Sequence, residues 1–156
     1  MINKSDDIIV MTIARLVIPF IQLYALYVLM HGHYSPGGGF QGGVILGASF
    51  ILLIITHGIV EARKKISQKA LTLFSSFGVF IYAGIGALCL ILAGNYLDYG
   101  QLSKILHVEP SHARSLGILG VETGVGLAVM AVMISIFINI SSFGESFNKN
   151  NSDEEE

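Results

Sequence analysis

Four long apolar runs set the strongest constraint on the fold of this chain of 156 residues. They span Ile8–Met30, Phe40–Val60, Leu71–Ala93 and Leu116–Ile140. A helix needs about 20 apolar residues to cross roughly 30 Å of hydrocarbon, and each run is long enough. Charged residues make up 13% of the chain and the mean hydropathy is +0.68, whereas a soluble domain carries about 25% charged residues. We therefore predict an all-α integral membrane protein with four transmembrane helices.

The runs take up most of the chain, so we expect one domain. A single four-helix transmembrane domain should cover residues 1–145, followed by a solvated, disordered acidic tail over residues 146–156. The single cysteine, Cys89, lies inside the third run and should be a small buried side chain. A net charge of −2 and the lack of a basic cluster give no sign of a nucleic-acid partner.

Basic residues in the connections predict the orientation. Four spans place both termini and the connection after the second run on one side of the membrane. That side carries Lys4, Arg63, Lys64, Lys65, Lys69 and Lys149, whereas the other side carries Lys104 and Arg114. The positive-inside rule then places both termini in the cytoplasm of a multi-pass cell (plasma) membrane protein.

The segment between the first two runs, residues 31–43, reads HGHYSPGGGFQGG. Glycine reaches backbone angles that a side chain forbids, and Pro36 fixes its own φ. We predict a glycine-rich turn with a defined path, at the edge of the membrane or dipping into it. The glycines that carry this structural motif are Gly37, Gly38, Gly39, Gly42 and Gly43. Irregular backbone at that depth is tolerated where it is buried in protein or lines water, and freed carbonyls there can coordinate Na⁺.

Small residues recur at helical spacing in three of the runs. Gly43 and Gly47 form a small-xxx-small pair in the second run. The third run has a stripe of mostly small residues, namely Ser75, Gly78, Tyr82, Gly86, Cys89 and Ala93. The fourth run repeats it with Gly117, Gly120, Gly124, Ala128, Ala131 and Ser135. Small side chains let helices approach closely in lipid, so we expect these stripes to be helix–helix contacts.

Glu122 is the only acidic residue within the four runs. It stands two positions from Gly120 and from Gly124, so it points about 160° away from the small stripe. Two opposite faces of this helix thus avoid lipid, and we infer that companion subunits cover them. An acid inside the membrane is functional by default. The alternative is a structural hydrogen bond made by the protonated carboxyl group.

Two further polar residues have both a structural and a functional interpretation. Arg15 shares one helix face with Pro19 and Gln22, about 10 Å into the first span. Arg15 either extends to the cytoplasmic headgroups or sets the potential along an ion path. His57, near the cytoplasmic end of the second span, is either an interfacial hydrogen-bonding group or a proton relay.

Enzyme chemistry has no support in the motifs. The glycine run follows an apolar helix and lacks the Lys-Ser/Thr pair of a nucleotide loop. The histidine spacings in residues 31–33 and 107–112 match no zinc pattern. We therefore expect no enzyme activity, no metal site and no cofactor, apart from Na⁺ as a transported ion that binds transiently.

The glycine-rich segment also carries a family resemblance. Residues 32–43, GHYSPGGGFQGG, resemble the G-H-x-x-P-G-G-G-F-x-G-G signature of the MnhB family, which supplies one of the small membrane proteins of multisubunit Mrp-type Na⁺/H⁺ antiporters. Residues 121–127, VETGVGL, are similar to the acidic Gly-Val-Gly stretch in the last span of that family, and the spacing Arg15…Pro19 is similar to its first helix.

The resemblance implies a subunit of a large antiporter complex. Its partners would be large subunits related to those of respiratory complex I, other small membrane subunits and the lipid bilayer. The chain would pack beside the ion-translocating subunits and help to shape the cation route. Candidate residues for that route are Glu122, Arg15, Pro36, Phe40 and His57. Two alternatives remain: an equivalent subunit of an energy-converting membrane-bound hydrogenase, and a subunit that serves assembly alone.

Overall fold

The computed structural model describes residues 4–32, 37–58, 66–93 and 95–153, and every regular element among them is helical. The elements in chain order are α1 (Lys4–Met30), α2 (Gly39–His57), α4 (Gln68–Ala93), η1 (Tyr99–Leu102), α5 (Ser103–Leu106) and α6 (Pro110–Asp153). Helices α1, α2, α4 and α6 are each long and apolar enough to cross a membrane. The prediction of an all-helical chain with four candidate spans is therefore confirmed.

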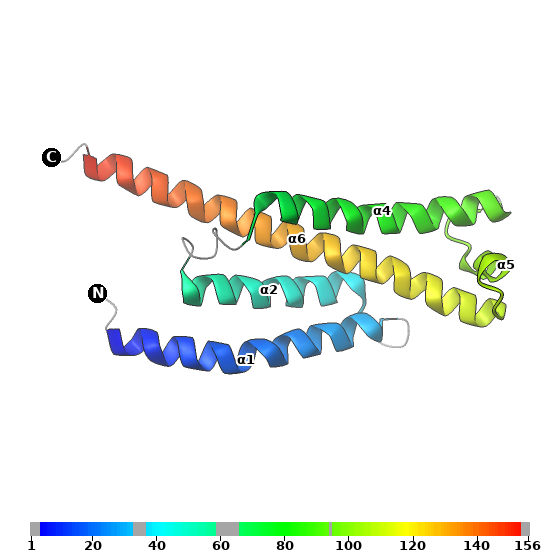
Figure 1. The fold of residues 1–156 in the computed structure, drawn as a ribbon, viewed down its shortest axis with the longest axis horizontal. Coiled ribbons are helices and arrows are strands. Elements are labelled where there is room, and N and C mark those ends of the chain that lie inside the picture. The colour runs from blue at the N-terminus through cyan, green and yellow to red at the C-terminus, as the bar shows by residue number, and fades with distance from the viewer. Residues whose placement is uncertain (1–3, 33–36, 59–65, 94, 154–156) are drawn as a thin grey trace.

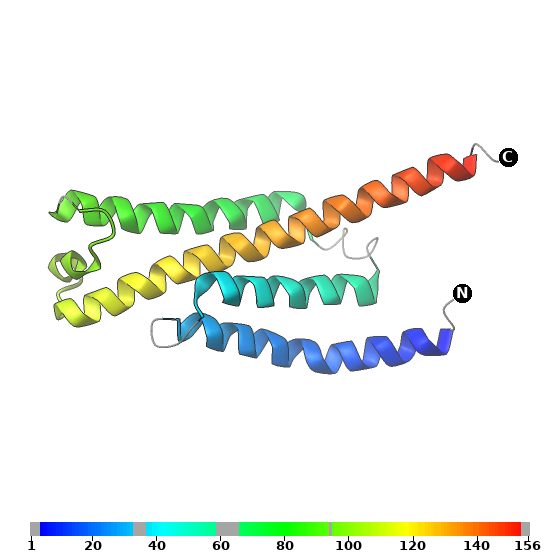
Figure 2. The same ribbon diagram turned by 180° about the vertical axis from the view of Figure 1, so that it is seen from behind.

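The four long helices lie in a row, in the order α1, α2, α6, α4 (Figure 1). Figure 2 shows the same order from behind, so α6 lies between α2 and α4 although it comes last in the chain. Helix α6 packs against α2 and α4, and α1 packs mainly on α2. The start of α1 and the end of α6 lie at the same end of the row, as an even number of spans requires.

Local sequence signals explain where the helices begin and end. Helix α6 begins at Pro110, six residues before the predicted span, because proline's fixed φ suits the first helical turn. Helix α2 ends at His57 and is followed by Gly58, whose φ is +87°. Between α4 and α6, the short helices η1 and α5 cover residues 99–106.

The C-terminal region differs from the prediction. Helix α6 runs for 44 residues to Asp153, so residues 146–153 are helical where we expected a disordered tail. No proline follows Pro110 in the sequence to interrupt the helix. At 1.5 Å per residue α6 is about 66 Å long, roughly twice the hydrocarbon thickness. Residues 154–156 lie outside the described part of the chain.

Two small clusters of buried side chains hold the row together. At the end where α2 finishes and α4 starts, Ile54 and Leu71 pack with Ile134 and Ile138 of α6. At the other end, Cys89, Leu102 and Ala113 form the second cluster. Cys89 is fully buried, in agreement with its predicted place in the protein interior.

Candidate functional site

One face of α6 packs on α4 through glycines. A Cβ atom placed on Gly124 would lie 2.7 Å from the Gly78 carbonyl oxygen, so the two backbones are in direct contact. Farther along α6, a Cβ on Gly120 would lie 2.7 Å from Cδ1 of Ile85. The same is true of Gly117 and the Tyr99 ring. The two predicted small stripes therefore face each other across this interface.

The opposite face of α6 packs on α2, again through glycines. A Cβ on Gly43 would lie 2.6 Å from the Gly126 carbonyl oxygen. Gly39 and Gly47 lie four residues to either side of Gly43, and each also contacts α6. Gly42 instead contacts α1, where a Cβ would lie 2.9 Å from Cβ of Leu29. Half of the glycine-rich segment is thus the first part of α2, used for close helix packing.

The two glycines before α2 lead the chain into that helix. Gly38 is the N-cap residue and has a φ of +128°, a conformation that favours glycine. It provides no side-chain cap for α2. Gly37 is exposed and packs near Cγ1 of Val28. The four residues before them, 33–36, lie outside the described part of the chain, and with them Pro36.

The carboxyl group of Glu122 lies in the corner between the end of α1 and the start of α2. A Cβ on Gly32 would overlap both carboxyl oxygens, and a Cβ on Gly38 would lie 3.2 Å from Oε1. A Cβ on Gly39 would lie 2.7 Å from Cα of Glu122. The Oε2 atom is buried. Three glycines therefore provide the space that this side chain occupies.

This corner offers favourable electrostatics to a carboxylate. The first turn of a helix presents backbone N–H groups and the positive end of the helix dipole. Glu122 lies against the first turn of α2, whose N-cap residue has no side chain. Outside the spans, burial raises the pKa of the Tyr99 hydroxyl, with Glu122 among the smaller causes. That direction agrees with negative charge at this end of α6.

The placement of Glu122 corrects one step of the sequence argument. We inferred companion subunits because two opposite faces of one helix avoid lipid. Both faces of α6 are covered by this chain itself, since α4 covers one and the α1–α2 corner covers the other. The last helix of the sequence lies in the middle of the row, and periodicity alone did not reveal that order.

The remaining candidate residues lie apart from Glu122. Arg15 is exposed on α1, 17 positions before Gly32, which corresponds to about 25 Å along the helix axis. Phe40 is 65% exposed. His57 lies at the end of α2, where its Nδ1 atom is 3.1 Å from the Leu53 carbonyl oxygen and 3.2 Å from the Thr56 hydroxyl. The structure thus brings Glu122 together with the glycine motif but not with Arg15 or His57.

Gly32 and Gly126 were missed as members of this site. Gly126 follows Glu122 by four positions and so lies on the same helix face, a signal that was present in the sequence. Gly32 follows the last residue of α1. Its contact with Glu122 depends on how distant segments pack, which the sequence pattern does not reveal.

Comparison with known proteins places this arrangement in a family. A family model described as a domain related to the MnhB subunit of Na⁺/H⁺ antiporter matches residues 9–135. A putative antiporter subunit mnhB2 of Staphylococcus haemolyticus is 27% identical over 144 residues, covering 88% of this chain and 96% of the relative. A Na⁺/H⁺ antiporter subunit of the same type from Alkalihalophilus pseudofirmus is 28% identical over 145 residues, covering 88% and 94%. The corresponding Bacillus subtilis protein is 35% identical over 93 residues, covering 59% and 58%.

Proposed function

Because the chain belongs to the family of domains related to the MnhB subunit of Na⁺/H⁺ antiporters, we infer that it is a membrane subunit of a multisubunit Na⁺/H⁺ antiporter. The observation that carries this inference is the match over residues 9–135, which includes most of the four candidate spans. The relatives named above are antiporter subunits. None of those three is named as a hydrogenase subunit, so the antiporter is the favoured setting.

The proposal extends to partners and orientation. The chain packs beside large ion-translocating subunits and other small membrane subunits, in the plasma membrane, with both termini in the cytoplasm. The bias of Lys and Arg between the connections supports that orientation. The open row of helices supports the need for partners, because many large apolar side chains on α1 and α4 are exposed in the isolated chain.

Within the complex, Glu122 biases the occupancy of the cation route. A carboxylate inside a membrane costs several kcal/mol unless its charge is balanced, and the positive end of α2 balances part of it. The carboxyl group also lies beside the glycine-rich turn that we expect around Pro36. A cation that passes this corner would meet a fixed negative charge, and Na⁺ bound there transiently would need no other cofactor.

The test compares transport with assembly in the complete antiporter complex. We expect Glu122→Gln to reduce Na⁺/H⁺ exchange in membrane vesicles about tenfold or more, as loss of a charge that acts on the ion would do. Complex yield on native gels should stay unchanged, because glutamine has the same size. The second variant, Pro36→Gly, should lower exchange in the same way.

A packing variant separates this role from a purely structural one. Gly124→Leu should abolish assembly, because the added side chain would meet the Gly78 backbone. If Glu122→Gln and Pro36→Gly both leave exchange unchanged while Gly124→Leu removes the complex, the chain serves assembly alone. The proposed role in the cation route would then be wrong.

A further inference from the structure

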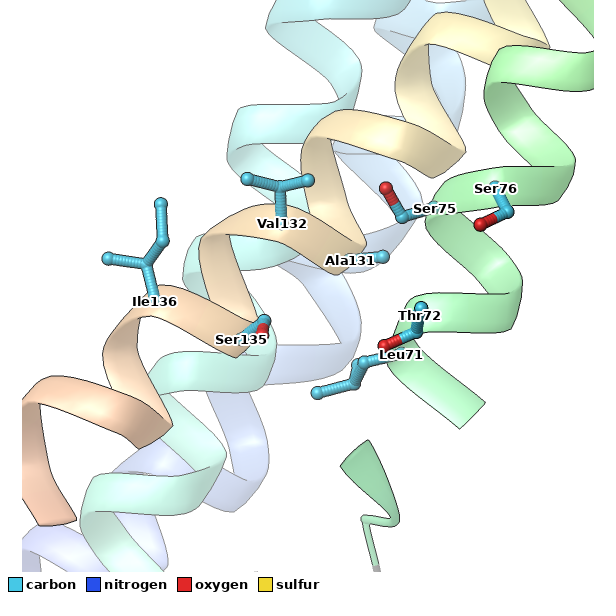
Figure 3. A pocket seen from close by; sticks show the side chains of 8 residues that line it. All are labelled: Leu71, Thr72, Ser75, Ser76, Ala131, Val132, Ser135 and Ile136. Atoms are coloured by element: carbon cyan, nitrogen blue, oxygen red, sulfur yellow. The ribbon is translucent and has the colours of Figure 1, made fainter. Parts of the chain in front are cut away.

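A groove with polar walls lies between α4 and α6, near the end of the row where α4 begins (Figure 3). It has a volume of about 180 Å³ and is open on one side. Four of its lining residues carry hydroxyl groups, namely Thr72, Ser75, Ser76 and Ser135. The groove is thus far richer in hydroxyl groups than the exposed apolar sides of α1 and α4.

Hydrogen bonds continue the polar surface at the end of the groove. Nε2 of Gln68 donates to Oδ1 of Asn139 at 2.9 Å, and the Ser135 hydroxyl donates to Oε1 of Gln68 at 3.3 Å. The Thr72 hydroxyl donates to the Gln68 carbonyl oxygen of its own helix at 3.1 Å. These contacts tie α4 to α6 along the wall of the groove.

Two hydroxyl groups in the groove have hydrogen-bonding capacity to spare. Among the described residues, no hydrogen bond is formed by the side chain of Ser75 or of Ser76. Both lie within the candidate span that begins at Gln68, about 10–12 Å along the helix. Acyl chains offer no hydrogen-bonding partner at that depth. A protein surface with donors and acceptors satisfies these groups better than lipid does.

We propose that this groove is the docking surface for a transmembrane helix of another antiporter subunit, one that presents small and hydrogen-bonding side chains. The inference rests on the proposed function, which supplies unlike neighbouring subunits. Small residues on both walls, Ser75, Ser76, Ala131 and Ser135, allow a close backbone approach. The other helices of this chain do not fill the groove, because α1 and α2 lie on the far side of α6 (Figure 1).

The surface continues from the groove to the start of α4. A second depression, lined by Gln68, Lys69, Thr72, Leu73 and Ser76, shares Thr72 and Ser76 with the groove. Lys69 places a positive charge at this end, so a partner helix with a carboxylate at the membrane surface fits it. The next position after Ser76 differs: Phe77 is large, apolar and exposed, which suits lipid contact.

Photo-crosslinking in membranes that contain the complete complex tests the occupant. The variant Ser76→p-benzoylphenylalanine should crosslink to a different antiporter subunit. Phe77→p-benzoylphenylalanine is the matched control, since it lies at the same depth about 100° away around the helix, and it should crosslink mainly to lipid. Crosslinks from position 76 to lipid alone, or to a second copy of this chain, would overturn the proposal.

A substitution tests the same surface by a second route. Ser76→Leu fills the groove from an exposed position, so the chain itself should still fold and insert. We expect the yield of complete complex to fall about fivefold or more, with no change for Phe77→Leu. If Ser76→Leu still co-purifies with the other subunits at full yield, the docking proposal fails and the proposed function stands. If the unaltered chain co-purifies with no antiporter subunit, the proposed function itself fails.

Discussion

The two faces of α6 are closed in different ways. The face toward α4 is a contact of small residues, with Gly124 against Gly78 and no charged side chain between the helices. The face toward α2 is as close, with Gly43 against Gly126, yet it also encloses the carboxyl group of Glu122. Both interfaces depend on glycine, but in one of them the space that glycine leaves is occupied by a charge.

That difference indicates what each interface is for. Close backbone contact is the usual means of association between helices in lipid, and the α4 face needs no other explanation. Glu122 adds an electrostatic cost that packing does not require. The glycines around it therefore do two things: Gly39 and Gly43 bring helices together, whereas Gly32 and Gly38 make room for the acid.

The largest effect should come from Gly39→Ala. The added methyl group would lie against the Glu122 backbone, which cannot rotate aside as a side chain can. Overpacking costs about 1–3 kcal/mol and occasionally more, and we expect the upper end or beyond. The amount of assembled complex on native gels should fall about tenfold or more.

The matched control for Gly39→Ala is Gly47→Ala, on the same face of the same helix. Its Cβ would lie 3.4 Å from Cβ of Met133 and 3.5 Å from Cα of Met130, which are ordinary contacts. Equal yields for the two variants would show that the close approach at Gly39 is not required.

On the α4 face, Gly78→Ala should have the next largest effect. A Cβ there would lie 2.8 Å from the Ala128 nitrogen and overlap the Gly124 carbonyl oxygen. We expect a loss of about 2 kcal/mol, measured as a lower melting temperature of the purified complex. Gly84→Ala is the control on α4, because its Cβ meets no atom within 4 Å, and it should gain up to about 1 kcal/mol from helix propensity. A similar melting temperature for both variants would contradict the interface.

The smallest effect on stability, and the most informative for function, is expected of Gly32→Ala. The added methyl group meets the end of the Glu122 side chain, which can move, so the cost should be about 1 kcal/mol or less. Exchange activity in vesicles should nevertheless fall, because the carboxylate is displaced from its corner. Gly37→Ala places its methyl group near Val28 instead and should retain activity. Unchanged exchange in Gly32→Ala would separate the position of Glu122 from transport.

Much of the fold could be predicted from the sequence, because the signals are local. Run length gave the four candidate spans, and Ile8–Met30 agrees with the structure at both ends. The spacing of Gly78 and Gly124 within their stripes identified the faces that meet. The direction of Glu122 away from Gly124 also follows from helical periodicity alone.

The rest depends on the order in which the helices pack. No local pattern places α6 between α2 and α4, so the occupant of the Glu122 face was assigned to another subunit. For the same reason the contact of Gly32 with Glu122 and the bond from Gln68 to Asn139 were missed, since each joins residues far apart in the chain. The helical end of α6 was missed because acidic composition suggested a solvated tail.

A layer one helix thick has a consequence for transport. Such a wall can border a conduit, but it cannot close around one, since closure requires helices on every side. Any ion that moves past Glu122 therefore travels along a seam between this chain and its neighbours. Loss of the chain would leave that seam open to the acyl chains of the bilayer.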